Sequence, residues 1–266
     1  MRKIMYHGRD GWPLFAVAVG AGPVLLLLHG GGPDHQSLLP IAERLADVRT
    51  VVVPDIRGYG RSVCADPALH TWRRYVDDVV SLLDHLGAAS AAVGGTGMGG
   101  TIALRACMAF PQRFAAAIVI SLEDIEDDDA KAAETALMDR FADRIHSDGL
   151  DAAWKLFLPM LQPLIGSLVR DAIPRTNPAS AAAAAAIGRD RAFRTVDELA
   201  SISVPVLIVP GADERHPSVL AEQACAILPK AQLASVTISS DLRTADDLAG
   251  RIAPGIRQFL TEPGTG

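Results

Sequence analysis

The chain has 266 residues, of which 49% are hydrophobic and 21% are charged, and its formal net charge at pH 7 is -6. This composition is typical of a globular protein with a substantial core. The net negative charge argues against a nucleic-acid partner and favours a neutral or weakly polar small molecule. We expect one domain with an insertion, because no linker-like segment interrupts the pattern.

The three cysteines, Cys64, Cys107 and Cys225, are widely spaced and odd in number. They indicate neither a disulfide framework nor a zinc site, and we expect no metal and no cofactor. Residues 1–5 lack the apolar core of a signal peptide, and the longest apolar run, at 24–28, is too short to cross a bilayer. The sequence therefore predicts a cytoplasmic protein without a membrane partner, and it leaves the oligomeric state open.

Strands and helices alternate along most of the chain. Apolar runs bounded by turn residues predict eight strands, at residues 3–7, 14–19, 24–28, 50–53, 91–94, 115–120, 206–209 and 233–238. Helical periodicity between them predicts helices at residues 36–46, 71–86, 100–110, 218–228 and 245–260. Because parallel neighbours need crossover connections, this alternation predicts an α/β fold with a mostly parallel sheet and helices on both faces.

Residues 122–196 follow a different pattern. They contain one helical segment after another without a convincing strand, and four prolines interrupt them. We interpret this segment as a helical insertion into a core made of residues 1–121 and 197–266. Trp154 and Phe157 have helical spacing within the insertion, and we expect them to line a substrate pocket or to pack its helices.

Three glycine-containing segments follow predicted strands. They are residues 29–33 (HGGGP), 55–62 (DIRGYGRS) and 95–99 (GTGMG). Together they resemble the oxyanion loop, the next loop and the nucleophile elbow of the α/β-hydrolase superfamily, over essentially the whole chain. The resemblance implies an α/β-hydrolase fold with a helical cap at the insertion, and ligands at the carboxyl ends of the strands.

The resemblance places a glycine where the family carries its catalytic serine. In the family, serine occupies the apex of the elbow and the next backbone N–H helps to bind the oxyanion. Here the apex is Gly97, and we expect Met98 N–H to form an oxyanion hole with an N–H of Gly30 or Gly31. Thr96 is not expected to be the nucleophile, because that register places Met98 where a close-packed glycine is required. It is instead a candidate for binding substrate.

The general base is also unusual. The family delivers its histidine from the loop after the last strand, but residues 239–243 contain none. The nearest candidate is His216, which follows the preceding strand. Its acidic partner would be Asp213, the more usual family position, or else Glu123 or Asp124 beside the elbow. The alternative is that His216 is a loop residue before a helix, with no catalytic role.

Two further histidines are candidates for contact with a substrate. His29 opens the predicted oxyanion loop, and His35 lies just after that loop. His35 is interpreted either as an acid or base or as a helix-start residue next to the capping Asp34.

Three functions fit these expectations. The first is hydrolysis of a small ester, lactone or related bond by a protein whose serine is replaced by Gly97 in this chain. Loss of that serine costs about 10⁶-fold in turnover and disables acyl-enzyme hydrolysis. The second is a natural lyase, isomerase or cyclase that uses the oxyanion hole with His216 or His35 and needs no covalent step. The third is a ligand-binding protein without catalysis; the substrate itself stays open.

Overall fold

A computed structural model describes residues 1–262 of the chain. Within this range eight strands form one sheet, in the order β1-β2-β4-β3-β5-β6-β7-β8. They are Arg2–His7, Pro13–Val19, Val24–Leu28, Thr50–Pro54, Ala91–Thr96, Phe114–Ile120, Val206–Val209 and Ala231–Leu233. The pairs β1/β2 and β2/β4 are antiparallel, whereas the other five pairs are parallel. The prediction of a mostly parallel eight-stranded sheet is therefore confirmed.

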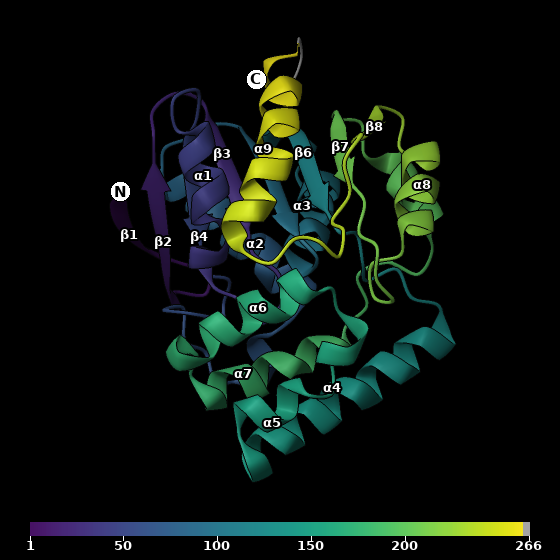
Figure 1. The fold of residues 1–266 in the computed structure, drawn as a ribbon. Helices are drawn as coiled ribbons and strands as arrows, with labels where there is room; N and C mark the ends of the chain where they lie inside the picture. The colour runs from purple at the N-terminus through teal and green to yellow at the C-terminus, as the bar shows by residue number, and fades with distance from the viewer. Residues whose placement is uncertain (263–266) are drawn as a thin grey trace.

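Helices cover both faces of this sheet (Figure 1). The helices of the core are α1 (Leu39–Leu45), α2 (Trp72–His85), α3 (Met98–Ala109), α8 (Ser218–Ile227) and α9 (Ala245–Thr261). Strand β3 shows how one strand serves both faces. Leu26 and Leu28 join the apolar cluster under α2, α3 and α8, whereas Leu25 and Leu27 join the cluster under α1 and α9. Burial on both faces explains why this strand is a continuous apolar run.

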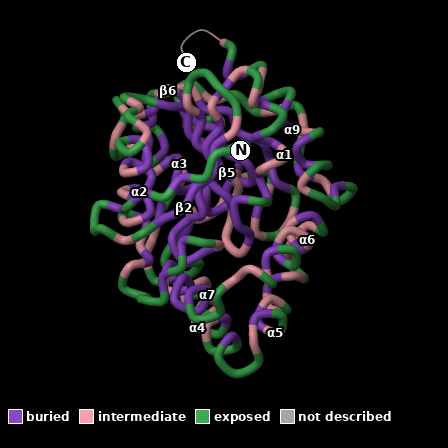
Figure 2. Tube along the Cα trace, turned by 90° about the vertical axis from the view of Figure 1, so that its left-hand side faces the viewer, coloured by how far each residue is buried: buried purple, intermediate pink, exposed green. Residues whose placement is uncertain are grey.

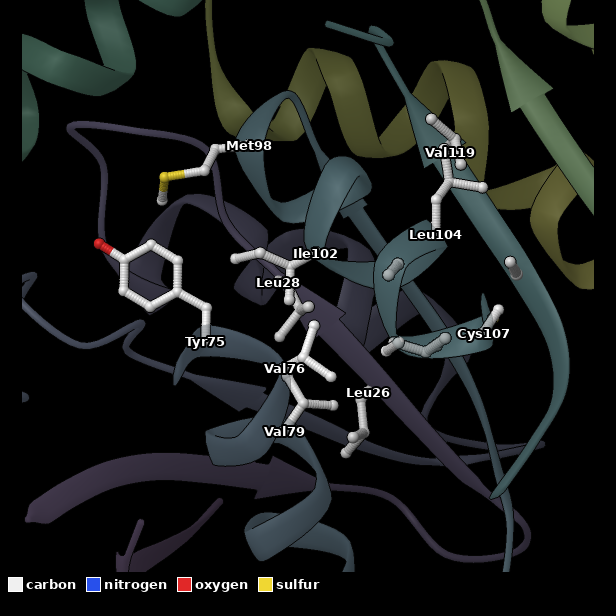
Figure 3. Packing of buried hydrophobic residues seen from close by; sticks show 14 of the residues in the cluster. Leu26, Leu28, Tyr75, Val76, Val79, Met98, Ile102, Leu104, Cys107 and Val119 are labelled. Atoms are coloured by element: carbon white, nitrogen blue, oxygen red, sulfur yellow. The ribbon is translucent and has the colours of Figure 1, made fainter. Parts of the chain in front are cut away.

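The first of these clusters connects the sheet to the start of α3. Figure 3 shows Leu28, Val76 and Ile102, from a strand and two helices, pointing toward one another. Met98 lies at the edge of the same cluster and is buried. Buried positions follow the central strands, and exposed positions follow the outer turns (Figure 2). The turn before Met98 is therefore fixed by packing on a rigid core.

A second group of helices lies beyond one end of the sheet, away from the C-terminus (Figure 1). It contains α4 (Asp128–Asp148), α5 (Leu150–Trp154), α6 (Pro163–Ala172), α7 (Pro178–Ala184), η4 (Leu158–Met160), η5 (Ile173–Arg175) and η6 (Ala185–Arg189). We call residues 128–189 the helical layer. It has an apolar cluster of its own, built around Phe141, Ile145 and Phe157. This layer occupies most of the segment in which the sequence predicted consecutive helices.

The remaining helical elements are short 3₁₀ turns. They are η1 (His35–Leu38), η2 (Pro67–Leu69), η3 (Pro111–Arg113) and η7 (Val196–Ser201). One of them changes a prediction, since η1 precedes α1 where a single helix over 36–46 was expected. Helix α3 also begins two residues earlier than predicted, directly after the turn at Gly97.

The predicted strand at 233–238 is wrong beyond Leu233. Strand β8 lies at the edge of the sheet, and its ladder with β7 ends at Leu233. Two later N–H groups still reach the carboxyl end of β7, Ala234 bonding Ile208 O at 2.8 Å and Ile238 bonding Pro210 O at 2.9 Å. Ile238 packs with the cluster under α9. Its apolar character therefore reflects packing, which a strand pattern does not distinguish from pairing.

Candidate active site

The turn between β5 and α3 leaves one residue, Gly97, in a left-handed conformation with φ +51° and ψ -121°. Two other glycines let the helix approach the sheet. A Cβ on Gly95 would lie 2.5 Å from both Leu28 O and the carbonyl carbon of Gly99. A Cβ on Gly99 would lie 2.6 Å from His29 O. The sequence GTGMG therefore produces a sharp, close-packed turn that places residue 97 just beyond the carboxyl end of β5.

His216 lies in the loop after β7 and is held by Asp213. The Asp213 Oδ1 atom accepts the backbone N–H of His216 at 2.9 Å and lies 2.7 Å from the ring Nδ1. These contacts fix the ring and leave Nε2 facing the turn, where a Cβ on Gly97 would be 3.5 Å away. Of the three candidate carboxylates, Asp213 is the one that bonds Nδ1. The pair is also tied to the helical layer, because Gln162 N–H donates to Asp213 Oδ2 at 2.9 Å.

Glu123, three residues after β6, faces the other ring nitrogen of His216. Its Oε2 lies 3.4 Å from His216 Nε2 and 3.6 Å from Arg215 Nη2. Met98 N–H, at the start of α3, also donates to this carboxylate. A Cβ on Gly97 would lie 2.6 Å from Glu123 Oε1. The Glu123 carboxylate therefore fills the space beside Gly97 and does not orient the imidazole through Nδ1.

Charges in this cluster set its protonation. Burial alone lowers the pKa of His216, but the charges and hydrogen bonds of Glu123 and Asp213 outweigh burial and raise it to about 9. Burial raises the pKa of Glu123, but the positive charges of His216 and Arg215 bring it below the usual value. At neutral pH the site therefore holds an imidazolium next to an ionised carboxylate.

Asp124 is a second, partly buried carboxyl group, in a left-handed backbone conformation with φ +64°. Its Oδ2 accepts the hydroxyl hydrogen of Thr101 at 2.8 Å. Burial, and then the negative charge of Glu123, raise the pKa of Asp124 well above its usual value. The pKa values of these adjacent carboxyl groups are thus shifted in opposite directions, that of Glu123 downward and that of Asp124 upward.

A cavity with an empty volume of about 1140 Å³, including its open mouth, extends from the turn into the helical layer. Among the residues predicted for the site, those that line it are Gly30, Gly31, Thr96, Gly97, Met98, Glu123, Asp124, Trp154, Phe157 and His216. The layer contributes aromatic walls, in which the ring centroids of Trp154 and Phe157 lie 5.0 and 5.2 Å from that of Phe141. The cavity is therefore apolar toward the layer and charged beside Gly97.

The structure places two of the candidates for substrate contact, His29 and His35, away from the cavity lining. His29 is fully buried, its Nε2 accepts Ile56 N–H at 3.0 Å, and burial lowers the pKa of its ring. His35 Nδ1 lies 2.8 Å from Asp55 Oδ1. Neither histidine lines the cavity. Both rings are occupied with buried polar partners that hold the loops after β3 and β4 together.

Two charged residues at the cavity were not identified from the sequence. Arg215 lies between Glu123 and Glu134, with Nη1 3.0 Å from Glu134 Oε2. Its guanidinium carbon also lies 5.3 Å above the ring of Phe157. Position next to His216 was the available signal for Arg215. Glu134 is in α4, and no sequence pattern connects it with a loop 81 residues away.

Within residues 1–262, no helix is long and apolar enough to cross a membrane. In the same range, no group of three or more His, Cys, Asp or Glu side chains is arranged to hold a metal ion.

Comparison with known proteins identifies the family of this chain. The model of the alpha/beta hydrolase family matches residues 25–247. An epoxide hydrolase from Caballeronia sordidicola is 34% identical over 115 residues, which are 42% of this chain and 35% of that protein. The match with this and the other first relatives thus spans less than half of their length.

Solved structures match over nearly the whole chain. A thermophilic esterase from Thermogutta terrifontis is 25% identical with a TM-score of 0.82, and the match covers 98% of each chain. The bottromycin epimerase BotH in complex with bottromycin A2 is 23% identical with a TM-score of 0.72, over 97% of this chain and 98% of that one. Since the family model covers most of the sequence, this protein belongs to the alpha/beta hydrolase family.

Proposed function

We propose that this protein is an enzyme that acts on a small, largely apolar carbonyl compound by acid–base catalysis, without an acyl-enzyme. One observation carries the proposal. His216, fixed through Nδ1 by Asp213, directs Nε2 at Gly97, which has no side chain to activate. With no hydroxyl at that position, the remaining chemistry is proton transfer and stabilisation of negative charge. Lyases, isomerases and cyclases are the reaction classes that need nothing more.

The cavity supports this class of substrate. Its walls in the helical layer are apolar and aromatic, whereas its charged groups gather at the end beside Gly97. Gly30 and Gly31 line the same end as Met98. The backbone N–H groups of Gly30 and Gly31 are the donors we assign to the developing negative charge on a carbonyl oxygen, because Met98 N–H already donates to Glu123. A molecule with an apolar body and one carbonyl group matches this arrangement.

Hydrolysis of a small ester or lactone is the second candidate, for a parent protein with serine at position 97. The conformation of Gly97 and the close packing at Gly95 and Gly99 favour it, because they are what an elbow with an exposed side chain requires. The esterase and epoxide hydrolase relatives also point to this chemistry. The fold itself does not require hydrolysis, since a protein described as an epimerase shares it.

Two substitutions separate these functions. The protein is assayed against activated esters, lactones and carbonyl compounds with an exchangeable C–H, the last by loss of the proton signal in D₂O. Acid–base catalysis predicts that His216→Ala abolishes an activity that Gly97→Ser does not improve. Hydrolysis by a serine-bearing parent predicts that Gly97→Ser alone gains ester turnover. Tight binding of a carbonyl compound without turnover by any variant would instead identify a binding protein.

A further inference from the structure

We propose that Glu123 is the proton acceptor of this site and stands in place of the side chain that Gly97 lacks. The inference rests on the proposed function, because it assigns the base of the acid–base reaction. It differs from the role expected for a carboxylate next to an elbow, which is to orient the histidine. Asp213 already has that role through Nδ1, so Glu123 is available for chemistry.

The first support is steric. A Cβ on Gly97 would lie 2.6 Å from Glu123 Oε1, so a side chain at 97 and this carboxylate position exclude each other. Three groups hold the carboxylate there, namely Met98 N–H, His216 Nε2 at 3.4 Å and Arg215 Nη2 at 3.6 Å. A serine at 97 would have to shift the Glu123 carboxylate from the place where these partners hold it. Glycine at the apex is therefore matched to Glu123.

The second support is electrostatic. Asp213 contacts Nδ1 of His216 and Glu123 contacts Nε2. Together these carboxylates raise the pKa of the imidazole to about 9. A histidine that activates a serine must instead be neutral at working pH. Here the histidine is the acid and the ionised Glu123 is the base, which reverses the usual assignment.

The other charged groups around Glu123 are consistent with this assignment. Arg215 from the β7 loop contacts Glu123, and Glu134 from α4 bonds the other side of the same guanidinium. On the segment after β6, burial and the charge of Glu123 raise the pKa of Asp124. The Glu123 carboxylate is therefore surrounded by donors, and the neighbouring carboxyl group ionises less readily than Glu123 does.

The proposed step needs no co-reactant. Glu123 takes a proton from a carbon next to the substrate carbonyl, and the C–H electron pair moves onto the carbonyl oxygen. The Nε2–H of His216 and the backbone N–H groups near Gly30 hold the resulting negative charge. Glu123 then delivers the proton to another atom of the conjugated system, so that the product is an isomer of the substrate.

The steric claim is tested without knowing the substrate, by labelling with a fluorophosphonate probe. We compare Gly97→Ser, Gly97→Ser with Glu123→Ala, and the matched control Gly97→Ser with Glu134→Ala, which removes a charge next to Arg215 but leaves the space beside residue 97 filled. We expect Gly97→Ser with Glu123→Ala to label at least about tenfold faster than either of the other two variants. Circular dichroism verifies that each variant is folded.

The labelling results distinguish a failure of the Glu123 assignment from a failure of the proposed function. If Gly97→Ser alone labels as fast as the double variant, Glu123 does not occupy the place of a nucleophile, and this inference fails while the site at His216 survives. If no folded serine variant labels, residue 97 is not presented to His216, and the proposed function fails as well.

The electrostatic claim has a separate test in the isosteric variant Glu123→Gln. Titration of the His216 ring by NMR is expected to show its pKa falling by about one unit or more, because the largest charge that favours the imidazolium is gone. Glu134→Gln is the control, because Glu134 contacts Arg215 and not the His216 ring. It is expected to change the pKa of His216 much less. An unchanged titration of His216 in Glu123→Gln would overturn the assignment.

Discussion

At the scale of the residue, the site is explained by what surrounds one imidazole. His216 has a carboxylate on each ring nitrogen, and both Asp213 and Glu123 are largely excluded from water. Opposite charges in a poorly solvated setting interact strongly, which is why the ring stays protonated despite its burial. The same contacts determine how the stability of the fold depends on pH.

The raised pKa of His216 predicts a loss of stability at alkaline pH. Its folded value of about 9 exceeds the ordinary 6.5, so the stabilisation is complete below about pH 6.5 and disappears as pH rises through 9. A shift of this size corresponds to about 3 kcal/mol. Urea unfolding at about pH 7 and about pH 10 should show the decrease in the unmodified protein.

His216→Gln provides the control for this prediction, because it removes the titrating group and keeps the size of the side chain. The free energy of unfolding of this variant should change less between the two pH values than that of the unmodified protein. An equal change in both proteins would assign the pH dependence to other groups and contradict a protonated His216.

Local sequence signals predicted part of this site. Asp213 and His216 are three residues apart after a strand, and such a pair bonds without help from the rest of the chain. The place of Glu123 was not predictable in the same way. Its segment was identified as close to the elbow. Which nitrogen of His216 it contacts depends on the relative position of two loops. The ion pair between Arg215 and Glu134 depends on a third element, α4.

At the scale of the element, the turn after β5 works because a helix and two strands meet there without side chains between them. Predicted and observed bounds agree best where burial on both faces enforces a continuous apolar run, as at Val24–Leu28. They agree least at the edge of the sheet, where β8 is short and its continuation is held by scattered contacts. Periodicity reports burial, and burial is weakest at an edge.

Gly95→Ala is expected to destabilise the fold by about 2–4 kcal/mol, because its Cβ would meet backbone atoms of β3 and α3 at 2.5 Å. Gly255→Ala is the matched control in α9, where nothing lies within 4 Å of the new Cβ. That change should raise stability by up to about 1 kcal/mol, since alanine favours a helix. Urea unfolding measures both, and equal effects would refute close packing at the turn.

At the scale of the whole molecule, the cavity exists because the helical layer docks on the carboxyl end of the sheet. The polar contacts between the two include Gln162 with Asp213, Arg175 with Asp34 and Arg215 with Glu134. The sequence predicted consecutive helices here from their pattern. It gave no indication of these contacts, because each pairs residues between 51 and 141 positions apart.

One buried hydroxyl gives the docking of the layer a direct test. Ser180 of α7 is fully buried, its Oγ accepts Cys64 N–H at 2.8 Å, and it lies 2.9 Å from Gly58 O, to which it donates. Ser180→Ala removes a partner from both backbone groups in the loop after β4. Because an unsatisfied buried group costs about 1–3 kcal/mol, we expect a loss of stability in that range by urea unfolding.

The same substitution at Ser201, an exposed serine whose hydroxyl bonds Glu198 O at 3.1 Å, is the control and should change stability by less than about 0.5 kcal/mol. Hydrogen exchange adds residue-level information that urea unfolding lacks. If Ser180 fastens the layer, amides of α7 should exchange faster in Ser180→Ala while those of β3 keep their protection, since local opening spares the central strands. Equal acceleration in both elements would mean that the layer and the sheet unfold as one unit, and that the cavity mouth does not open separately.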